Sequence, residues 1–479
     1  MNPRMKQTLA TIATAALAVW IGVNVAQEQH LLAAAVSGLA LWGLLSWTTQ
    51  PSTEAWLLAF LFFGYTIGNR GFAQIMPLSG VPLFLGELGL AVGLSVMLLR
   101  GALVRRFPLH WDPLNGWLAT WILLGSFRVA LDVRVHGFMA LRDFALVYYA
   151  FYFYLAQAAA DQGATRSLLH RAMLATFFVL PVTAALVDAF PEFMLTRFTL
   201  NHVPVIFYKD DLVGTYLCAG FLLLLPTAGV AGPERTWRWI FAVGSLLVGL
   251  IQLSRASMLG LMVGAAVLAA AGRWRAGRTV VTVVAVGTLL LSVYALFERR
   301  DVSQTKAYGV YEQLISIVDV QGTGSYRNKE TMDSGDNNRF RLVWWRTVAE
   351  ETLQGGPLFG LGFGYDLARA FLQEYSPLAE DFTARSPHSV IFTTFGRMGL
   401  VGLAGLLAAG GAGVLLTRLV VRRVRAGEAP ETLLSLFAAC WVVAVSSCFG
   451  VVLEGPMGAI PFWIMLGLAA REARDPPAA

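Results

Sequence analysis

The sequence predicts an all-α integral membrane protein, a polytopic bundle of about 12–14 transmembrane helices with one large loop on the outer side. Composition is the first indication, because 56% of the 479 residues are hydrophobic and 14% are charged, against roughly 25% charged in a soluble domain. The second is that apolar residues gather into blocks of roughly 15–20, close to the ~20 residues that a helix needs to cross a bilayer. The third is that arginine and lysine recur in alternate connections between these blocks.

Each apolar block is interpreted as a helix, because backbone groups in lipid must be satisfied within the segment itself. In chain order the candidate spans are residues 8–25, 31–47, 55–69, 83–99, 114–130, 143–160, 172–190, 212–230, 238–254, 257–271, 279–297, 389–416, 432–450 and 457–470. The chain then divides into an N-terminal transmembrane bundle (1–297), a large outer loop (298–388) and C-terminal transmembrane helices (389–479).

Orientation follows from the basic residues, which favour the cytoplasmic side of short connections. Half of the 36 basic residues fall on one face if the N-terminus is inside. They are Arg4, Lys6, Arg100, Arg105, Arg106, Arg166, Arg171, Arg235, Arg238, Arg273, Arg275, Arg278, Arg418, Arg422, Arg423, Arg425, Arg471 and Arg474. Both termini are therefore predicted inside, and the net charge of +6 is first a topology signal rather than an indication of nucleic-acid binding. The first block is interpreted as a retained span, since residues 24–27 make a poor signal-peptide cleavage site.

The outer loop contains one predicted amphipathic helix, at about residues 338–354. In Arg339–Ala349 apolar residues recur at helical spacing and basic residues occupy the remaining face. The preceding asparagine run is expected to supply an N-cap, and Gly355 and Gly356 to end the helix. We expect this helix to lie at the outer membrane interface, with Trp344 and Trp345 as anchors.

Arg255 and His388 are candidate functional residues. Arg255 interrupts two apolar blocks at their outer ends, where a cation is costly unless it faces a cavity or a partner. The alternative is an arginine in a tight turn whose side chain reaches the interface. His388 stands where the outer loop enters a span, and its imidazole has an ordinary pKa suited to taking a proton from a hydroxyl group. The alternative there is a helix-capping or interface residue.

Other features narrow the possible chemistry. Further arginines in the short outer connections, among them Arg142, make that face attractive to phosphates, although salt bridges account for some of them. No Walker loop is present, and the first outer loop lacks a pair of acidic residues. The three cysteines fall inside apolar spans, as small hydrophobic residues do. The sequence therefore predicts neither a metal ion nor a cofactor.

Taken in order, these motifs resemble those of the bacterial O-antigen ligase and polymerase superfamily, and most closely an O-antigen ligase of the WaaL type. The resemblance covers roughly the C-terminal half of the chain, and the first half matches mainly in hydropathy. Its segments are Ser254–Gly260, Arg341–Trp345, Gly356–Gly364, Pro387–Ile391, Gly396–Gly402 and Gly455–Trp463, with Leu141–Phe144 in the first half.

The resemblance implies a glycosyltransferase of GT-C-like architecture in the bacterial inner membrane, working on the periplasmic face. It would be inverting and metal-independent, and would take a glycan from undecaprenyl pyrophosphate to a hydroxyl of the lipid A–core in lipopolysaccharide biosynthesis. By the matching motifs, Arg255 and Arg341 would bind the pyrophosphate and His388 would act on the acceptor hydroxyl. Arg339 is the alternative loop arginine, and Arg142 a further candidate for lipid phosphates.

Other functions remain open from the sequence. A Wzy-type polymerase would use a second lipid-linked glycan as acceptor, and a protein O-glycosylation ligase would use a polypeptide. A flippase or other transporter of lipid-linked glycans belongs to a different class and predicts charged residues near the midplane of broken helices. The outer position of the charges argues against a transporter.

Overall fold

The computed structural model describes residues 53–76, 84–104, 110–200, 203–225, 230–252, 254–298, 302–332, 334–375 and 384–475. This part of the chain is mostly helical, and its two strands, β1 (Thr199–Leu200) and β2 (Val203–Pro204), form one short antiparallel pair. The all-α prediction is therefore confirmed for the described residues. The predicted spans at 8–25 and 31–47 lie outside them.

The other predicted spans each coincide with helices. The long helices are α3 (Thr53–Phe63), continued by the π-helix η1 (Gly64–Gly68), α5 (Leu85–Val104), α6 (Pro113–His136), α10 (Gly163–Ala189), α12 (Asp210–Leu224), α13 (Gly232–Ile251), α14 (Arg255–Ala270), α15 (Arg275–Glu298), α19 (Val390–Arg425), α20 (Glu431–Ser447) and α21 (Pro456–Glu472). The block predicted as one span at 143–160 is instead divided among α7 (Phe138–Asp143), α8 (Ala145–Tyr148) and α9 (Phe151–Ala159). Short elements complete the described fold: α4 (Arg70–Ala73), α11 (Pro191–Thr196) and the 3-10 turn η2 (Val302–Gln304).

Two of the described helices, α10 and α19, are long and apolar enough by length and composition to cross a membrane. Five shorter apolar segments, in α3 with η1, α5, α12, α14 and α20, do not reach that length. The helical content is thus established, whereas the predicted total of spans stays a prediction.

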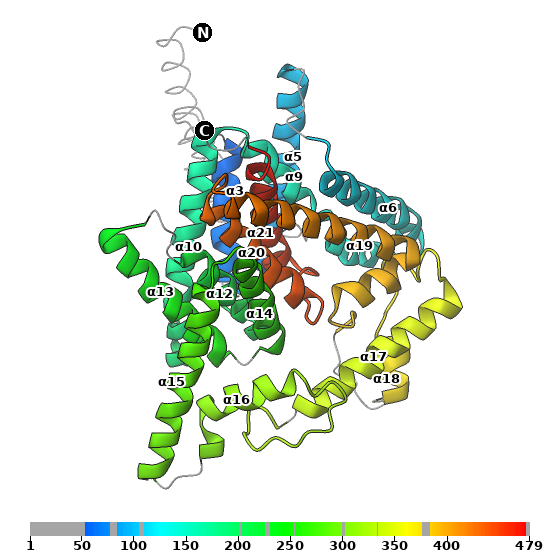
Figure 1. Ribbon diagram of the computed structural model, residues 1–479. Coiled ribbons are helices and arrows are strands. Elements are labelled where there is room, and N and C mark those ends of the chain that lie inside the picture. Colours follow the sequence, from blue (N-terminus) through cyan, green and yellow to red (C-terminus); the bar gives the residue numbers. More distant parts are fainter. Residues whose placement is uncertain are drawn as a thin grey trace, which may run out of the picture.

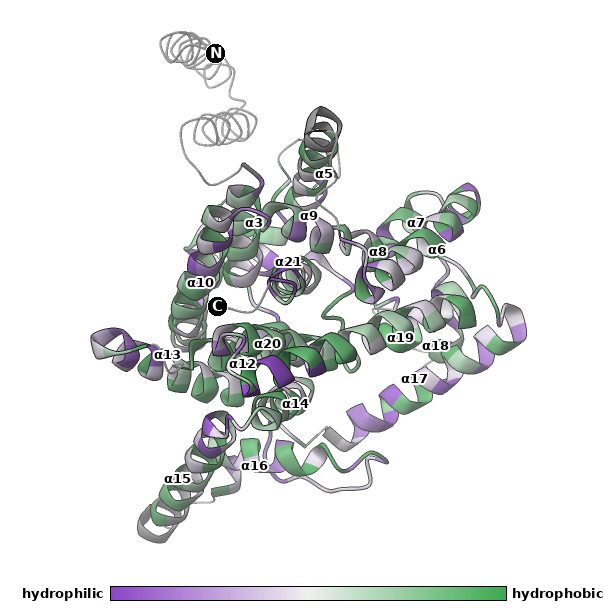
Figure 2. Cartoon of the chain, turned by 45° about the horizontal axis from the view of Figure 1, so that its top comes forward, coloured by the Kyte–Doolittle hydropathy of each residue, from purple (hydrophilic) through white to green (hydrophobic). Residues whose placement is uncertain are grey.

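The helices pack into a bundle with the outer-loop elements gathered at one end (Figure 1). Helix α14 packs along α20, α12 along α13 and α20, α21 along α9, and α19 along α6. The outer-loop helices α16 (Lys306–Ser316) and α17 (Ser334–Gly355) follow one another across that end, and α18 (Arg369–Tyr375) packs against α17. Figure 2 shows hydrophobic residues dominating α14, α19 and α20, whereas hydrophilic stretches alternate along α17.

Helix α17 confirms the predicted loop helix but not its tryptophan anchors. Trp344 is fully buried, stacks on Phe371 of α18 with ring centroids 5.0 Å apart, and donates its indole N–H to the carbonyl of Leu367 at 2.8 Å. Trp345 stacks on Phe392 of α19 at 5.0 Å. The expected membrane-surface anchor is therefore wrong for Trp344, because neighbouring loop residues cover its whole ring. Trp345 is half-buried, and its role as an anchor stays a prediction.

Two glycines bring the start of α19 against the glycine-rich segment 356–364. Gly399 interrupts α19 with φ 64° and ψ −161°, and Gly360 also has positive φ, 73°. The backbones of the two segments are in direct contact. The N–H of Leu361 donates to the carbonyl of Gly396 at 2.7 Å, and a Cβ on Gly399 would lie 2.4 Å from the carbonyl carbon of Leu358. Only glycine satisfies both the dihedral angle and the space.

We expect Gly399→Ala to destabilise the folded state by about 2–5 kcal/mol, the sum of left-handed strain and overpacking. Gly410→Ala, later in the same helix, is the matched control, because a Cβ there meets nothing within 4 Å. It should change stability by less than ~1 kcal/mol. Unfolding of both variants in detergent checks this, and equal stability of the two would refute the role given to Gly399.

Candidate active site

Arg255 projects from the first turn of α14 toward α17. The helix begins there because the Oγ of Ser254 accepts a hydrogen bond from the backbone N–H of Ser257 at 3.3 Å. The Arg255 guanidinium donates to the Oδ1 of Asn338. The Asn338 amide group in turn donates to the carbonyls of Ser316, at 3.2 Å, and Asp319, at 2.7 Å. Asn338 is therefore not the predicted helix cap, since α17 begins earlier, at Ser334, and it links Arg255 to the outer loop.

Arg341 follows Asn338 on α17 by three residues and so lies on the same side of the helix. Its guanidinium donates to the carbonyl of Phe449 at 2.8 Å, and its Nε is buried with no hydrogen-bond partner among the described residues. Burial lowers the pKa of Arg341 from its ordinary value, and the charge of Asp211 opposes that shift. The group stays cationic near neutral pH because arginine starts from so high a pKa.

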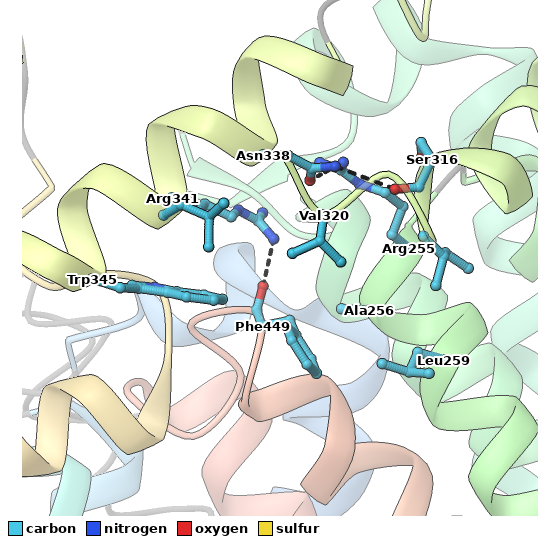
Figure 3. Close-up of a pocket in the computed structure, with 11 residues that line it drawn as sticks. Arg255, Ala256, Leu259, Ser316, Val320, Asn338, Arg341, Trp345 and Phe449 are labelled. Carbon is cyan, nitrogen blue, oxygen red and sulfur yellow. Dashed lines mark hydrogen bonds between the residues drawn. The ribbon is translucent and has the colours of Figure 1, made fainter. Parts of the chain in front are cut away.

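A cavity of about 110 Å³ lies between α14, α16, α17 and the turn after α20. Figure 3 shows Arg255 and Arg341 reaching into it from opposite helices. The remaining wall is largely apolar, including Leu259, Val320 and the ring of Trp345. Two guanidinium groups and an apolar wall in one small cavity suit an amphiphile with an anionic head.

His388 precedes α19 in a strained conformation. Its φ is 54°, in the left-handed region that non-glycine residues rarely adopt and that is often found at functional sites. The half-buried ring lies 5.6 Å from that of Trp344, centroid to centroid. Trp345 donates its indole N–H to the carbonyl of Pro387, immediately before the histidine, at 2.7 Å. Helix α17 therefore carries Arg341 and, one turn later, the residues that contact the His388 segment.

The surroundings of His388 favour its neutral form. Burial, then the charges of Lys209 and Arg341, lower the pKa of His388 to about 4, and Asp211 opposes them. Lys209 and Asp211 lie at the start of α12, with Nζ and Oδ2 3.6 Å apart. A neutral imidazole near pH 7 is the form that accepts a proton.

The structure groups three of the five predicted site residues and separates two. Arg255 and Arg341 share the cavity, and His388 lies beside α17. Arg339 is exposed, pairs with Asp336 and does not line the cavity. Arg142 is exposed at the end of α7 and is also outside the described cavity.

Sequence reasoning missed one part of the site and one buried ion pair outside the cavity. One is the turn 448–455 between α20 and α21, whose Phe449 carbonyl binds Arg341. A backbone acceptor leaves no trace in residue type, so no sequence signal could have shown it. The other is a buried ion pair between Arg397 and Asp143, 2.8 Å apart. Arg397 and Asp143 each lie in a segment that carried the family resemblance, and a charged residue in each of these apolar segments was the sequence signal for a buried ion pair.

Residues 240–407 match the family model described as O-antigen ligase. The match includes Arg255, Arg341 and His388, supports membership of the chain in the O-antigen ligase family, and confirms the resemblance over that range. No curated protein shows a significant match to the chain. The family supports a glycosyltransferase-like enzyme of the ligase or polymerase type, with lipid-linked glycan and lipid acceptor substrates in general terms. Within the described residues no group of three His, Cys, Asp or Glu side chains is arranged to hold a metal ion.

Proposed function

We propose that the protein is an O-antigen ligase. It is an inverting, metal-independent glycosyltransferase that moves a glycan from undecaprenyl pyrophosphate to a hydroxyl of the lipid A–core on the periplasmic face of the inner membrane. The observation that carries the proposal is the meeting of Arg255 and Arg341 in one cavity, with His388 held beside the same helix.

The two arginines suit the departure of the donor lipid. In the transfer, the acceptor oxygen bonds to the anomeric carbon as the bond from that carbon to the phosphate oxygen breaks. The leaving pyrophosphate takes the bonding electron pair, so negative charge develops on it. Guanidinium groups placed in advance, with no reorganisation to make, stabilise that charge. The apolar wall at Leu259 and Val320 suits the isoprenoid carbons next to the phosphates.

His388 suits the role of general base. The attacking group is a neutral hydroxyl, whose proton must leave as the new bond forms. A neutral imidazole accepts that proton, and burial and the nearby cations keep His388 neutral. Among the described residues no group is hydrogen-bonded to the ring nitrogens of His388, which leaves them available to a substrate hydroxyl that reaches the half-buried ring.

The arrangement of helix ends supports the proposed topology. Around the C-terminal end of α21, Arg471 pairs with Asp161 at 2.8 Å, and Arg423 donates to the carbonyl of Asp475 at 2.9 Å. Arg166 also pairs with Asp475. These connections are all predicted to be cytoplasmic. Helix α21 begins at the turn that contacts Arg341 and ends at this cluster, so the candidate site and the cluster lie at opposite ends of the same helix.

Outward-facing apolar side chains support a lipid environment. On α6, Leu123 and Phe127 are each 68% exposed, and Leu131 and Val135 continue the row at four-residue spacing. On α15, Leu289 and Leu290 are each 63% exposed. Rows of large apolar residues along 24-residue helices, each about 36 Å long, would be unfavourable in water.

Transfer by the purified protein tests the proposal. We expect a lipid-linked glycan donor and rough lipopolysaccharide to give glycosylated lipopolysaccharide. An elongated lipid-linked chain would instead show a polymerase, and label on a polypeptide a protein ligase. Translocation of the donor with none of these products, persisting in Arg255→Ala and His388→Ala, would show a transporter.

Chelation tests the metal-free part of the mechanism. We expect the transfer rate to be unchanged in EDTA, because the cations opposite the leaving group are side chains of the protein itself. The rate is measured before and after treatment, with a metal-dependent glycosyltransferase as the chelation control. Activity that disappears in EDTA and returns only with Mg²⁺ or Mn²⁺ would contradict the prediction.

A further inference from the structure

The turn 448–455 contacts the candidate site at two points. Its first contact is the Phe449 carbonyl, which accepts from Arg341 at 2.8 Å. Its second is the carboxylate of Glu454, five residues later. One short turn between α20 and α21 therefore touches the arginine on one side and the segment of the proposed base on the other.

Glu454 is hydrogen-bonded to residues on both sides of His388. Its carboxylate accepts hydrogen bonds from the Oγ of Ser386 and, at 2.7 Å, from the Oγ1 of Thr393. Ser386 lies in the segment that leads to the histidine, and Thr393 lies in the first turn of α19 after it. His388 between them has φ 54°, so the segment does not rest in its intrinsically preferred conformation. A strained residue persists only when its neighbours are held in place.

We propose that Glu454 is a positioning residue for the transfer. By holding Ser386 and Thr393 it keeps His388 in its left-handed conformation, with the imidazole against Trp344. This inference rests on the proposed function of His388. Glu454 itself takes no part in bond making or proton transfer, and its effect on the reaction passes through the histidine.

Two matched substitutions isolate the contact. Thr393→Val removes the hydroxyl that binds Glu454 and keeps the side-chain shape. Thr394→Val makes the same change one residue later, where the buried hydroxyl has no hydrogen-bond partner among the described residues. We expect Thr393→Val to lower kcat about tenfold and Glu454→Ala up to about 100-fold, within the range that general-base positioning contributes. Thr394→Val should leave kcat nearly unchanged, and KM for the donor should change little in all three variants.

Glu454→Gln tests conservative rescue. A glutamine oxygen accepts from one hydroxyl and its amide donates to the other, so the link survives without the negative charge. We expect this variant to recover most of the activity that Glu454→Ala loses. Recovery by glutamine would show that the hydrogen bonds, not the charge, carry the effect.

Reactivity of His388 gives a readout that does not depend on transfer. Diethyl pyrocarbonate modifies the neutral imidazole, and peptide mass spectrometry reports its extent at His388 from about pH 4 to 8. In the wild type, burial, Lys209 and Arg341 keep the His388 pKa at about 4. If Glu454→Ala releases the ring toward solvent, its pKa should rise toward 6.5. Loss of a negative charge alone would lower it, so the sign separates the two causes.

The outcomes distinguish this inference from the proposed function. An unchanged or lowered His388 pKa in Glu454→Ala, with Thr393→Val as active as Thr394→Val, would overturn the positioning role. A raised pKa in a protein that transfers no glycan would leave the positioning intact and remove the ligase assignment. If Glu454→Ala does not fold, the comparison between Thr393→Val and Thr394→Val decides the question.

Discussion

His388→Ala is expected to reduce glycan transfer by about 10²–10⁴, the range that a positioned general base supplies. The acceptor is a neutral hydroxyl, and without the imidazole its proton has no defined destination. Donor binding should survive, because Arg255 and Arg341 are untouched. The measurement is kcat for transfer alongside the donor dissociation constant.

A second substitution separates chemistry from backbone strain at the same position. Asparagine tolerates the left-handed conformation that His388 adopts, at φ 54°, but it supplies no base. His388→Asn should therefore fold like the wild type and lose as much activity as His388→Ala. Substantial transfer by a well-folded His388→Asn protein would rule out the histidine as base.

The same assignment fixes the sign of the pH dependence. With a His388 pKa of about 4, kcat/KM should stay level from neutral pH down to about pH 5 and fall below that as the imidazole gains a proton. Lys209 lowers this pKa and Asp211 raises it. Lys209→Ala should therefore move the acid limb to higher pH and Asp211→Asn to lower pH. Shifts in the opposite directions would contradict the geometry around the ring.

Arg255→Ala and Arg341→Ala are each expected to lower kcat by about 10²–10³, the cost of removing one preorganised group opposite a developing charge. Arg341→Lys should recover only part of that loss, because an ammonium group cannot reproduce bidentate contact with phosphate oxygens. Steady-state rates at saturating donor give the values.

Arg339→Ala is the internal control for both arginines. It lies on the same helix, two residues from Arg341, but it is exposed, pairs with Asp336 and does not line the cavity. We expect it to keep nearly full activity. If Arg339→Ala lost as much transfer activity as Arg341→Ala, the donor site would have to be assigned to the other face of α17.

Much of the helical architecture is readable from local pattern. From residue 53 onward every predicted span coincides with helix, and the block at 143–160 differs only in being broken into short pieces. This succeeds because block length and apolar content follow from the neighbouring residues alone. The same locality explains why the burial of Trp344 was not predicted. A tryptophan pair on an amphipathic helix suits a membrane surface, and the local pattern does not show that Phe371 of α18 stacks on Trp344 in the folded chain.

The candidate site shows a different balance. Arg255 and His388 stood out individually, since a charge or an imidazole at the end of an apolar block is costly without a purpose. Arg341 was indicated by the family resemblance, with Arg339 as the alternative. Their partners did not stand out, because Arg255 meets Asn338 across 83 residues and Arg341 meets Phe449 across 108. Contacts at that separation depend on how helices pack, and many packings satisfy one hydropathy pattern.

Residue types and their spacing were thus enough to establish a helical chain and the charged groups available for chemistry, and to predict an orientation in the membrane. Packing in three dimensions chose Arg341 over Arg339 as the arginine of the cavity, set His388 in the left-handed region and placed Glu454 across its flanking hydroxyls. The physical reason is range: hydrophobic burial acts on whole helix faces, whereas a hydrogen bond requires two atoms about 3 Å apart. The sequence pattern therefore predicts which helix faces are buried, whereas the individual hydrogen bonds are seen only in the folded structure.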